Sequence, residues 1–348
     1  MDSRQTEDGP NVSGGSGSTG GTGSGGGKGG GAGVGTGTGP LLPSCLADPG
    51  CPWAQLDPMP LRSRGQAAVE LGGAFYVIGG DRVERDQATD VAPEEQYTPA
   101  YSAVFRYDPV DQRWTPRAHL PVGLYVLSAH VLDGKIYVFG GYGASGFEPV
   151  VQIYDPTSDS WSEGPRMPTP RYVFSSAVVD GRVFVIGGQG PASDQVNWEY
   201  KTVVEIFDPA QGWSTGSSLP RAVAGAASCS IDGRIYVFGG ETDNLTWIYD
   251  VAGDSWSQGK QPGLARSHHT CVRVADALIV LGGSTKKALT LDLVEQYHPG
   301  SDSWTEREAL PTPRYDFGAD ALGSKLYVFG GQTPSELLDS VEVLDVRP

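Results

Sequence analysis

A unit of apolar runs and turn residues recurs six times along the chain. In each unit an apolar run ends in a pair of glycines, as in FYVIGG, IYVFGG and LIVLGG. These runs are apolar at consecutive positions, which is typical of a strand covered on both faces. The pattern therefore predicts six buried β-strands. They end at Gly79-Gly80, Gly140-Gly141, Gly187-Gly188, Gly239-Gly240, Gly282-Gly283 and Gly330-Gly331.

A tryptophan precedes each Gly-Gly pair at a constant distance. Trp114 stands 140 − 114 = 26 residues before Gly140, and the same interval follows Trp53, Trp161, Trp213, Trp256 and Trp304. Between them lie a first strand and a tight turn such as Asp133-Gly134, which favours a two-residue hairpin. After Gly-Gly come a variable loop and a third strand that closes on sequences such as Tyr154-Asp155-Pro156. Four strands in about 50 residues form one blade of a β-propeller.

The two ends of the chain complement each other. The sixth unit stops at Leu344-Asp345 without a tryptophan strand of its own, whereas Trp53 precedes the first Gly-Gly pair. We expect the segment around Pro52 to Leu56 to pair with the C-terminal strands and complete the last blade. Closure of this kind removes the sheet edges that an open array would expose.

The Gly-Gly pairs, the Tyr-Asp-Pro sequences and the tryptophans that follow them resemble the kelch-repeat family over about residues 50–348. The resemblance implies an all-β fold, a six-bladed kelch-type β-propeller over residues 45–348, closed by the N-terminal strand. It is specific for the fold and leaves the function open.

Residues 1–44 differ in composition from the rest of the chain. Residues 11–40 are almost entirely Gly, Ser and Thr, which predicts a disordered tail or linker. The start, MDSRQTEDGP, shows no signal peptide. A glycine-rich spacer before a folded domain nevertheless resembles the stalk of bacterial surface lipoproteins. We therefore favour an extracellular or surface-anchored protein whose leader is absent from this sequence, with a cytoplasmic protein as the alternative.

The formal charge is 25 − 41 = −16, which argues against nucleic acid as a partner. Since apolar runs of about 18 residues are missing, we expect no membrane span. We expect a monomeric propeller.

The chain has 4 cysteines. Cys45 and Cys51 can form a small disulfide if the protein is exported. Cys229 and Cys271 fall in the first strands of adjacent blades, and we expect buried free thiols there. Without a Cys-x-x-Cys or Cys/His cluster, no metal or cofactor is expected.

The first strands of a propeller converge on a central channel, and one loop from each blade reaches its mouth. The position ten residues after the tryptophan is arginine in three blades, and a tyrosine follows in three. In kelch domains, arginines at the equivalent place line the ligand-binding face. By this resemblance we predict binding by Arg171, Arg266, Arg314, Tyr125, Tyr172, Tyr315 and His268. The alternative is that each arginine pairs with an acid of a neighbouring blade and only holds the ring together.

Two loops after Gly-Gly are enlarged, residues 81–106 and 189–206. Long loops within a compact fold are often functional. Trp198 in the second loop is a predicted platform for a sugar or anchor for a partner, or it packs onto the blade beneath.

These features favour a ligand-binding or interaction module that recognises a protein or a glycan at the propeller mouth. The alternative is an enzyme of the same fold, such as a sialic-acid mutarotase-like epimerase. That reading needs an acid–base pair, such as an inward Glu with Arg171 or Arg266. Since no catalytic or metal-ligand spacing is recognisable, the sequence favours binding over catalysis.

Overall fold

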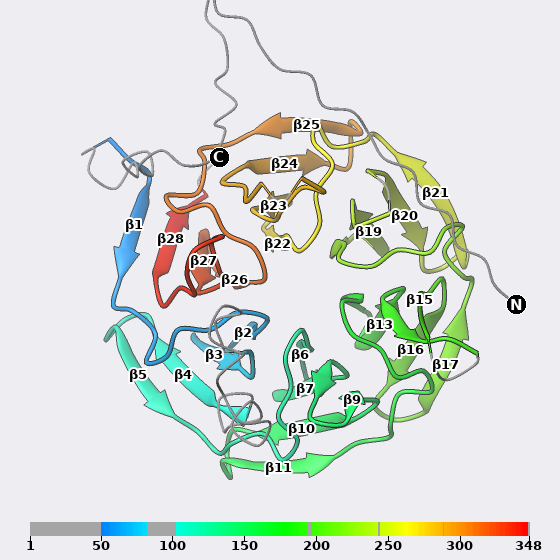
Figure 1. Cartoon of the computed structure of the whole chain (residues 1–348), viewed down its shortest axis with the longest axis horizontal. Helices are drawn as coiled ribbons and strands as arrows, with labels where there is room; N and C mark the ends of the chain where they lie inside the picture. The colour runs from blue at the N-terminus through cyan, green and yellow to red at the C-terminus, as the bar shows by residue number, and fades with distance from the viewer. Residues whose placement is uncertain (1–49, 82–101, 194–196, 243, 288, 347–348) are drawn as a thin grey trace, which may run out of the picture. The chain divides into compact units, whose positions relative to one another are not determined.

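The computed structural model describes residues 50–81, 102–193, 197–242, 244–287 and 289–346. These residues form six four-stranded antiparallel sheets, arranged as blades around a ring (Figure 1). The predicted six-bladed, all-β propeller is confirmed. No helix in the described part of the chain is long and apolar enough to cross a membrane.

The first three blades follow the predicted strand order. Blade 1 contains β2 (Ala67–Leu71), β3 (Ala74–Ile78), β4 (Val104–Asp108) and β5 (Arg113–Pro116). Blade 2 contains β6 (Ser128–Leu132), β7 (Lys135–Phe139), β10 (Val151–Asp155) and β11 (Ser160–Glu163). Blade 3 contains β12 (Ser175–Val179), β13 (Arg182–Ile186), β16 (Val204–Asp208) and β17 (Gly212–Gly216). Two small hairpins extend from blades 2 and 3: β8 (Tyr142–Gly143) with β9 (Gly146–Phe147), and β14 (Gln189–Pro191) with β15 (Trp198–Tyr200).

The last three blades have the same order, and the sixth uses both ends of the chain. Blade 4 contains β18 (Ala227–Ile231), β19 (Arg234–Phe238), β20 (Thr246–Asp250) and β21 (Ser255–Gly259). Blade 5 contains β22 (Thr270–Val274), β23 (Ala277–Leu281), β24 (Val294–His298) and β25 (Ser303–Glu306). Blade 6 contains β26 (Gly318–Leu322), β27 (Lys325–Phe329), β28 (Val341–Asp345) and β1 (Trp53–Leu56). The pairing of Trp53 with Leu344 confirms the predicted closure.

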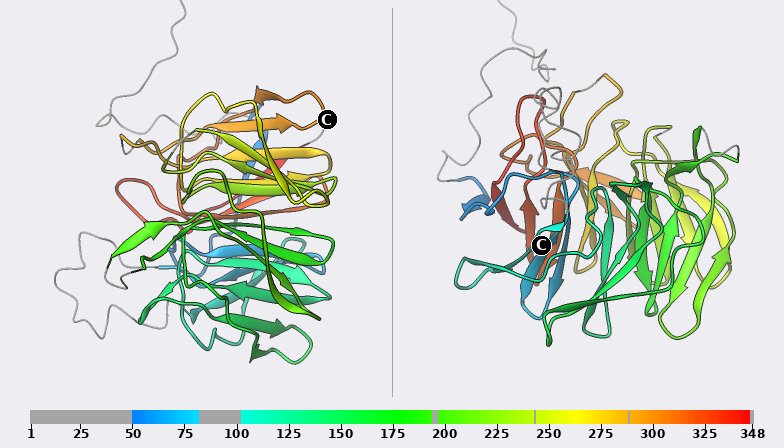
Figure 2. Two further views of the ribbon diagram at one scale, coloured as in Figure 1. Left: turned by 90° about the vertical axis from the view of Figure 1, so that its right-hand side faces the viewer. Right: turned by 60° about the horizontal axis from the view of Figure 1, so that its bottom comes forward.

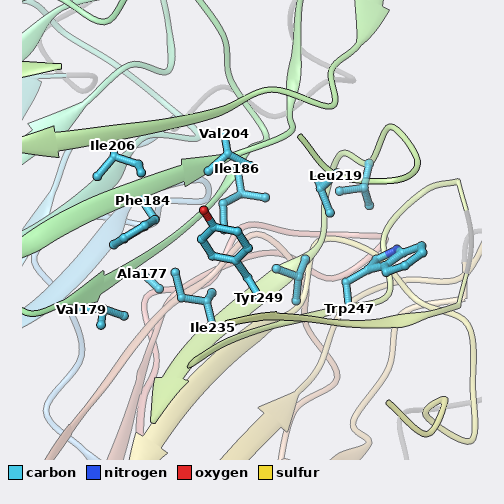
Figure 3. Packing of buried hydrophobic residues seen from close by; sticks show 12 residues of the cluster. Ala177, Val179, Phe184, Ile186, Val204, Ile206, Leu219, Ile235, Trp247 and Tyr249 are labelled. Atoms are coloured by element: carbon cyan, nitrogen blue, oxygen red, sulfur yellow. The ribbon is translucent and has the colours of Figure 1, made fainter. Parts of the chain in front are cut away.

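Each seam between neighbouring blades contains an apolar cluster. The second strands contribute to every one of these clusters, and their residues are almost all buried, as their unbroken apolar runs predict. Between blades 3 and 4, for example, Phe184 and Ile186 of β13 pack with Ile235 and Tyr249 of blade 4 (Figure 3). Equivalent clusters occupy the other five seams. Burial of these side chains holds one blade against the next.

The Gly-Gly pairs form a ring of hydrogen bonds from blade to blade. In all six blades the backbone N–H of the second glycine donates to a carbonyl of the next blade, with N···O distances of 2.7–3.1 Å. The acceptor is the residue ten positions after the tryptophan, as in Gly141 to Arg171 and Gly188 to Val223. Both glycines have positive φ angles, which favour glycine over other residues. The glycines are thus required by the seam.

Five of the six tryptophans join neighbouring blades through an indole N–H bond to a backbone carbonyl. The indole N–H of Trp161 donates to the carbonyl of Ala118 in the preceding blade, at 2.8 Å. Trp213 and Trp256 make the same bond to Pro165 and Ser217. The interval from tryptophan to Gly-Gly therefore separates two contacts between blades, the indole bond and the glycine bond. Since both contacts must form at once, the interval is constant.

The structure contradicts the expectation of free thiols at Cys229 and Cys271. These residues form a disulfide between β18 and β22, with Cα atoms 5.8 Å apart. Cys51 also takes part in a disulfide. Its expected partner, Cys45, lies outside the described residues, so this pairing stays a prediction. The predicted tail, residues 1–44, also lies outside them.

Candidate functional site

One face of the ring carries both the loops that follow the Gly-Gly pairs and the segments that lead into the first strands. Isolated bridges tie the two together, for example Tyr125 with Tyr142 and Ser267 with Ser284. We call this side the mouth face. The left panel of Figure 2 shows the green β14–β15 hairpin extending from it, beyond the strands of the blades. The turns between first and second strands, and between third and fourth strands, lie on the opposite face.

A channel opens at the centre of the mouth face. Its cavity has a volume of about 230 Å³ and is lined by the first strands and the residues just before them. Small side chains such as Ala68, Ser176 and Ser228 line it, as expected for strands that converge. Charged groups enter the lining at His268 and Asp316. The channel is therefore polar on the side of blades 5 and 6.

The structure does not place the three predicted arginines on the mouth surface. Arg171, Arg266 and Arg314 are 0%, 2% and 0% exposed. Each pairs with a glutamate on the third strand of its own blade: Arg171 with Glu205 and Arg266 with Glu295, both at 2.6 Å, and Arg314 with Glu342. The prediction that these arginines line the ligand-binding face is therefore wrong. The alternative prediction, that each arginine pairs with an acid of a neighbouring blade, is also wrong. The guanidiniums are enclosed, and we leave them out of the candidate site.

These ion pairs fasten the Gly-Gly segments from within the blade. Arg171 donates to the carbonyl of Gly187, and its own carbonyl accepts from Gly141 of the preceding blade. Burial lowers the pKa of Arg171 to about 10, against the opposing effect of the Glu205 charge. The guanidinium therefore stays charged at neutral pH, and its fork of donors serves backbone carbonyls and one carboxylate. Arg171 and Arg266, predicted as members of an acid–base pair in the epimerase alternative, are enclosed in their blades and do not line the channel.

His268 is at the centre of a charged network that crosses the mouth. Its Nδ1 lies 2.8 Å from Asp316 Oδ1, and its Nε2 lies 2.9 Å from Glu241 Oε1. Burial alone would lower the pKa of His268, but Asp316 and Glu241 together raise it to about 10. The imidazole is therefore a cation at neutral pH. The Tyr200 hydroxyl donates to the other oxygen of Glu241, so the network joins blades 3, 4, 5 and 6.

A second polar group links blades 6 and 1 at the mouth face. Arg64 donates to Gln332 Oε1 at 2.5 Å and to Asp81 Oδ2 at 3.1 Å. Next to it, a groove of about 530 Å³ lies between the loops of blades 5 and 6. Charged side chains of both signs, including Arg64, Lys286 and Glu336, line this groove together with several hydroxyl groups. Such a lining offers hydrogen bonds in many directions to a polar ligand.

An aromatic patch covers the mouth over blades 2 and 3. The patch consists of Tyr125, Tyr142, Phe147 and Tyr172, whose ring centroids are 5.4–6.5 Å apart. All four side chains are half-buried. The mouth thus has an aromatic side and, across the channel, a charged side at His268. Two of the predicted tyrosines belong to the patch, whereas Tyr315 contacts His268.

Trp198 is exposed on the β14–β15 hairpin. Its exposed fraction is 57%, and its ring lies 5.8 Å from that of Tyr200. The alternative that it packs onto the blade beneath is therefore wrong. Leu264 and Leu289 are also exposed, and both stand on segments of the mouth face. Most of the other enlarged loop, residues 82–101, lies outside the described residues.

Sequence reasoning identified His268 but missed Glu241, Asp316 and Tyr200. Glu241 and Tyr200 lie in loops after Gly-Gly, where the repeat imposes no residue type. Asp316 occupies the position equivalent to His268 in the next blade, twelve residues after the tryptophan. An acid and a histidine at equivalent positions of adjacent blades was a signal that could have been used.

Four-stranded blades in a closed ring, with a central channel and variable loops on one face, define a six-bladed β-propeller. The sequence matches the family model described as the KLHDC2/KLHL20/DRC7 Kelch-repeats domain over residues 65–257 and 165–331. These matches extend over more than half of the chain. The chain belongs to the kelch-repeat family.

Individual relatives share this repeat region. Kelch-like protein 38 of Mus musculus is 28% identical over 264 residues, which make up 74% of this chain and 42% of that protein. Kelch-like protein 35 of Mus musculus is 32% identical over 136 residues, 37% of this chain and 22% of that protein. Alpha-scruin of Limulus polyphemus is 28% identical over 164 residues, 44% and 18% respectively. The alignments thus span less than half the length of these relatives.

A solved structure shows the same architecture. The chain titled "Structure of YjhT" superposes with a TM-score of 0.68 and covers 82% of this chain and 95% of its own, at 18% identity. At this level of identity the likeness concerns the fold alone.

Proposed function

We propose that this chain is a protein-binding propeller that holds a segment of its partner on the mouth face. The observation that carries the proposal is the distribution of exposed apolar side chains. Among the described residues, the large exposed hydrophobics are Val110, Trp198, Leu264 and Leu289. Three of these four stand on mouth-face segments, and only Val110 lies in a turn of the opposite face.

The surroundings of these side chains support the same assignment. Trp198 adjoins Tyr200, which links it to the charged network around Glu241 and His268. An exposed aromatic beside ordered polar groups is the usual composition of an interface hot spot. The aromatic patch of Tyr125, Tyr142, Phe147 and Tyr172 adds further apolar surface on the same face, over blades 2 and 3.

The family supports an interaction module as well, because the relatives that share the repeats are Kelch-like proteins. The ligand that we propose is a peptide segment with apolar side chains, bound on the mouth face.

The proposal can be tested with a phage-displayed library of random peptides selected on the purified wild-type protein. Selected peptides are then titrated against Trp198→Ala and against Val110→Ala as the control on the opposite face. We expect Trp198→Ala to weaken binding about 30-fold, the size of a hot-spot loss of about 2 kcal/mol, and Val110→Ala to leave it unchanged.

Two outcomes would contradict the proposal. One is a set of peptides whose binding depends on Val110 and is indifferent to Trp198. The other is a library that yields no mouth-dependent peptide, while a glycan array yields ligands whose binding Trp198→Ala weakens. That result would assign the mouth to carbohydrate.

A further inference from the structure

A covalent bond joins the innermost strands of two adjacent blades. Cys229 is the third residue of β18 in blade 4, and Cys271 is the second residue of β22 in blade 5. The two cysteines are 42 residues apart in sequence. Both strands belong to the wall of the channel, since Ser228 of β18 and Cys271 of β22 line its cavity.

At the neighbouring seams, hydrogen bonds hold the first strands together. Between blades 3 and 4, Ser230 Oγ donates to the Val178 carbonyl at 2.7 Å. Between blades 5 and 6, Thr270 Oγ1 donates to the Phe317 carbonyl at 3.2 Å. Between blades 4 and 5, Arg273 Nη1 donates to the Ser230 carbonyl at 3.5 Å, and the disulfide is added to this contact. Among the described residues, this is therefore the seam whose first strands are joined by a covalent bond.

The same two strands start at the charged network of the mouth. Four residues before Cys229 is Gly225, and three residues before Cys271 is His268. The His268 N–H donates to the Gly225 carbonyl at 2.8 Å. Across the same seam, the imidazole of His268 bonds Glu241 of blade 4. The disulfide is thus only three to four residues along each strand from the contacts that position His268.

We propose that the Cys229–Cys271 disulfide is a redox-sensitive staple of the mouth, which holds blades 4 and 5 together beneath the His268 network. This inference does not depend on the proposed function, because it concerns the geometry of the mouth whatever binds there. Disulfides persist in oxidising compartments and are rare in reducing ones. Reduction is expected to loosen the seam and to free His268 and Glu241 from their fixed separation.

The reaction needs a dithiol as reductant. A thiolate of the dithiol enters the channel and attacks Cys271 Sγ, which lines the cavity, and the bond to Cys229 breaks with departure of the Cys229 thiolate. The second thiol of the reductant then displaces Cys271. Two electrons pass from the reductant, which leaves as a cyclic disulfide, and the protein retains two thiols after protonation.

The experiment uses the full chain carrying Cys45→Ala and Cys51→Ala, so that Cys229 and Cys271 are the remaining cysteines. The protein is treated with dithiothreitol under native conditions, alkylated, and analysed by mass spectrometry. Amide hydrogen exchange is followed in residues 222–231 and 264–274. Residues 128–132, the first strand of blade 2, serve as the internal reference, because blade 2 adjoins neither blade 4 nor blade 5. The matched control adds Cys229→Ala and Cys271→Ala in the same background.

We expect no alkylation before reduction and two alkylated cysteines after it. Exchange at residues 222–231 and 264–274 should rise at least several-fold on reduction, and residues 128–132 should stay unchanged. The thermal midpoint should fall by roughly 5–10 °C, because the crosslink no longer restricts the unfolded chain. The control should show no response to dithiothreitol.

The proposal is overturned if both cysteines are alkylated before reduction in protein folded in an oxidising compartment. It is also overturned if two thiols appear on reduction while exchange around His268 remains unchanged. Should the control variant not fold, reduction and reoxidation of the Cys45→Ala/Cys51→Ala protein give the same two readouts. Exchange that fails to return after reoxidation then counts against the staple.

Discussion

A guanidinium enclosed in the interior, as at Arg171, is stable only because every nearby acceptor is in place. Glu205 supplies the carboxylate, and the carbonyls of Gly187, Val185 and Val203 accept from the two terminal nitrogens of the guanidinium. Removal of one partner leaves a buried charge without compensation, which is among the costliest changes in a protein interior.

We predict that Arg171→Met lowers the free energy of unfolding by about 3–5 kcal/mol, because Glu205 is left buried and unpaired. The matched control is Arg166→Met, since Arg166 pairs with Glu163 on the surface, where both side chains are more than half exposed. Chemical denaturation measures both variants. A loss in Arg171→Met no greater than that in the control would show that the pair does not stabilise the blade.

The role of these arginines could have been read from the repeats. The blades that carry Arg171, Arg266 or Arg314 also carry a glutamate on the third strand, and the other blades carry neither. In two of those other blades the arginine position holds Leu124 and Val223, which are apolar and buried. An interior position and a joint occurrence of Arg with Glu point to a buried ion pair. The resemblance to ligand-binding arginines of kelch domains led to the surface placement instead.

His268 gives the mouth a pH dependence with a defined sign. Its pKa is about 10 in the folded protein, above the ordinary value of 6.5. The charged network therefore contributes stability that is complete below about pH 6.5 and is lost as the pH rises through 10.

We predict that His268→Gln removes this contribution, because glutamine keeps hydrogen bonds but carries no charge. The wild type should exceed the variant in free energy of unfolding at pH 6, and the difference should shrink toward pH 10. Urea titrations at pH 6, 8 and 10 measure it. A difference that is constant with pH, or that grows above pH 8, would contradict the charged state of His268.

At the scale of the elements, each Gly-Gly pair links the end of a second strand to the neighbouring blade. A Cβ atom on Gly187 would lie 2.6 Å from the Val223 carbonyl oxygen of the next blade, and the φ angle there is +62°. Gly181, in the hairpin turn of the same blade, has a φ of +72° with nothing within 4 Å of its Cβ position.

We predict that Gly187→Ala destabilises the protein markedly more than Gly181→Ala. Both substitutions force alanine into a left-handed conformation, which costs about 1–2 kcal/mol, but only the first also separates two blades. Denaturation of the two variants measures the difference. Equal losses would mean that the seam adjusts to the extra carbon and that the glycines serve only their φ angles.

The fold was predictable at this scale, because the tryptophan and the glycines each contact the adjacent blade and so cannot shift in register. The Gly-Gly pairs marked the ends of the second strands, and the segment predicted to close the ring, Pro52 to Leu56, contains β1 (Trp53–Leu56). The charged network was not predictable, since Glu241 and Tyr200 come from loops whose length and composition follow no repeat. The bond between Cys229 and Cys271 was missed because sequence spacing alone does not establish which first-strand side chains face each other.

For the whole molecule, closure depends on β1. This strand is the outermost of blade 6, and it pairs with β28 through Trp53 to Leu56. Trp53 is buried among residues of blades 5 and 6, including Val294 and Leu344.

We predict that deletion of residues 49–57 destabilises the entire ring, because it removes a strand and exposes the edge of β28. A truncation that removes only residues 1–44 should melt as the wild type does. The variant Cys51→Ala separates loss of the strand from loss of the Cys51 disulfide. Differential scanning calorimetry provides the measurement, and an unchanged cooperative transition in the deletion variant would reject closure by β1.

The central functional claim concerns a face, so the most direct measurement is a footprint. Amide hydrogen exchange of the wild-type protein is compared with and without the tightest peptide from the phage selection. The account predicts protection in residues 142–147, 197–201 and 264–269 on the mouth face, with the opposite-face turns at 109–112 and 156–159 unchanged. Protection confined to those turns, with the mouth segments exchanging as in the protein alone, would contradict it.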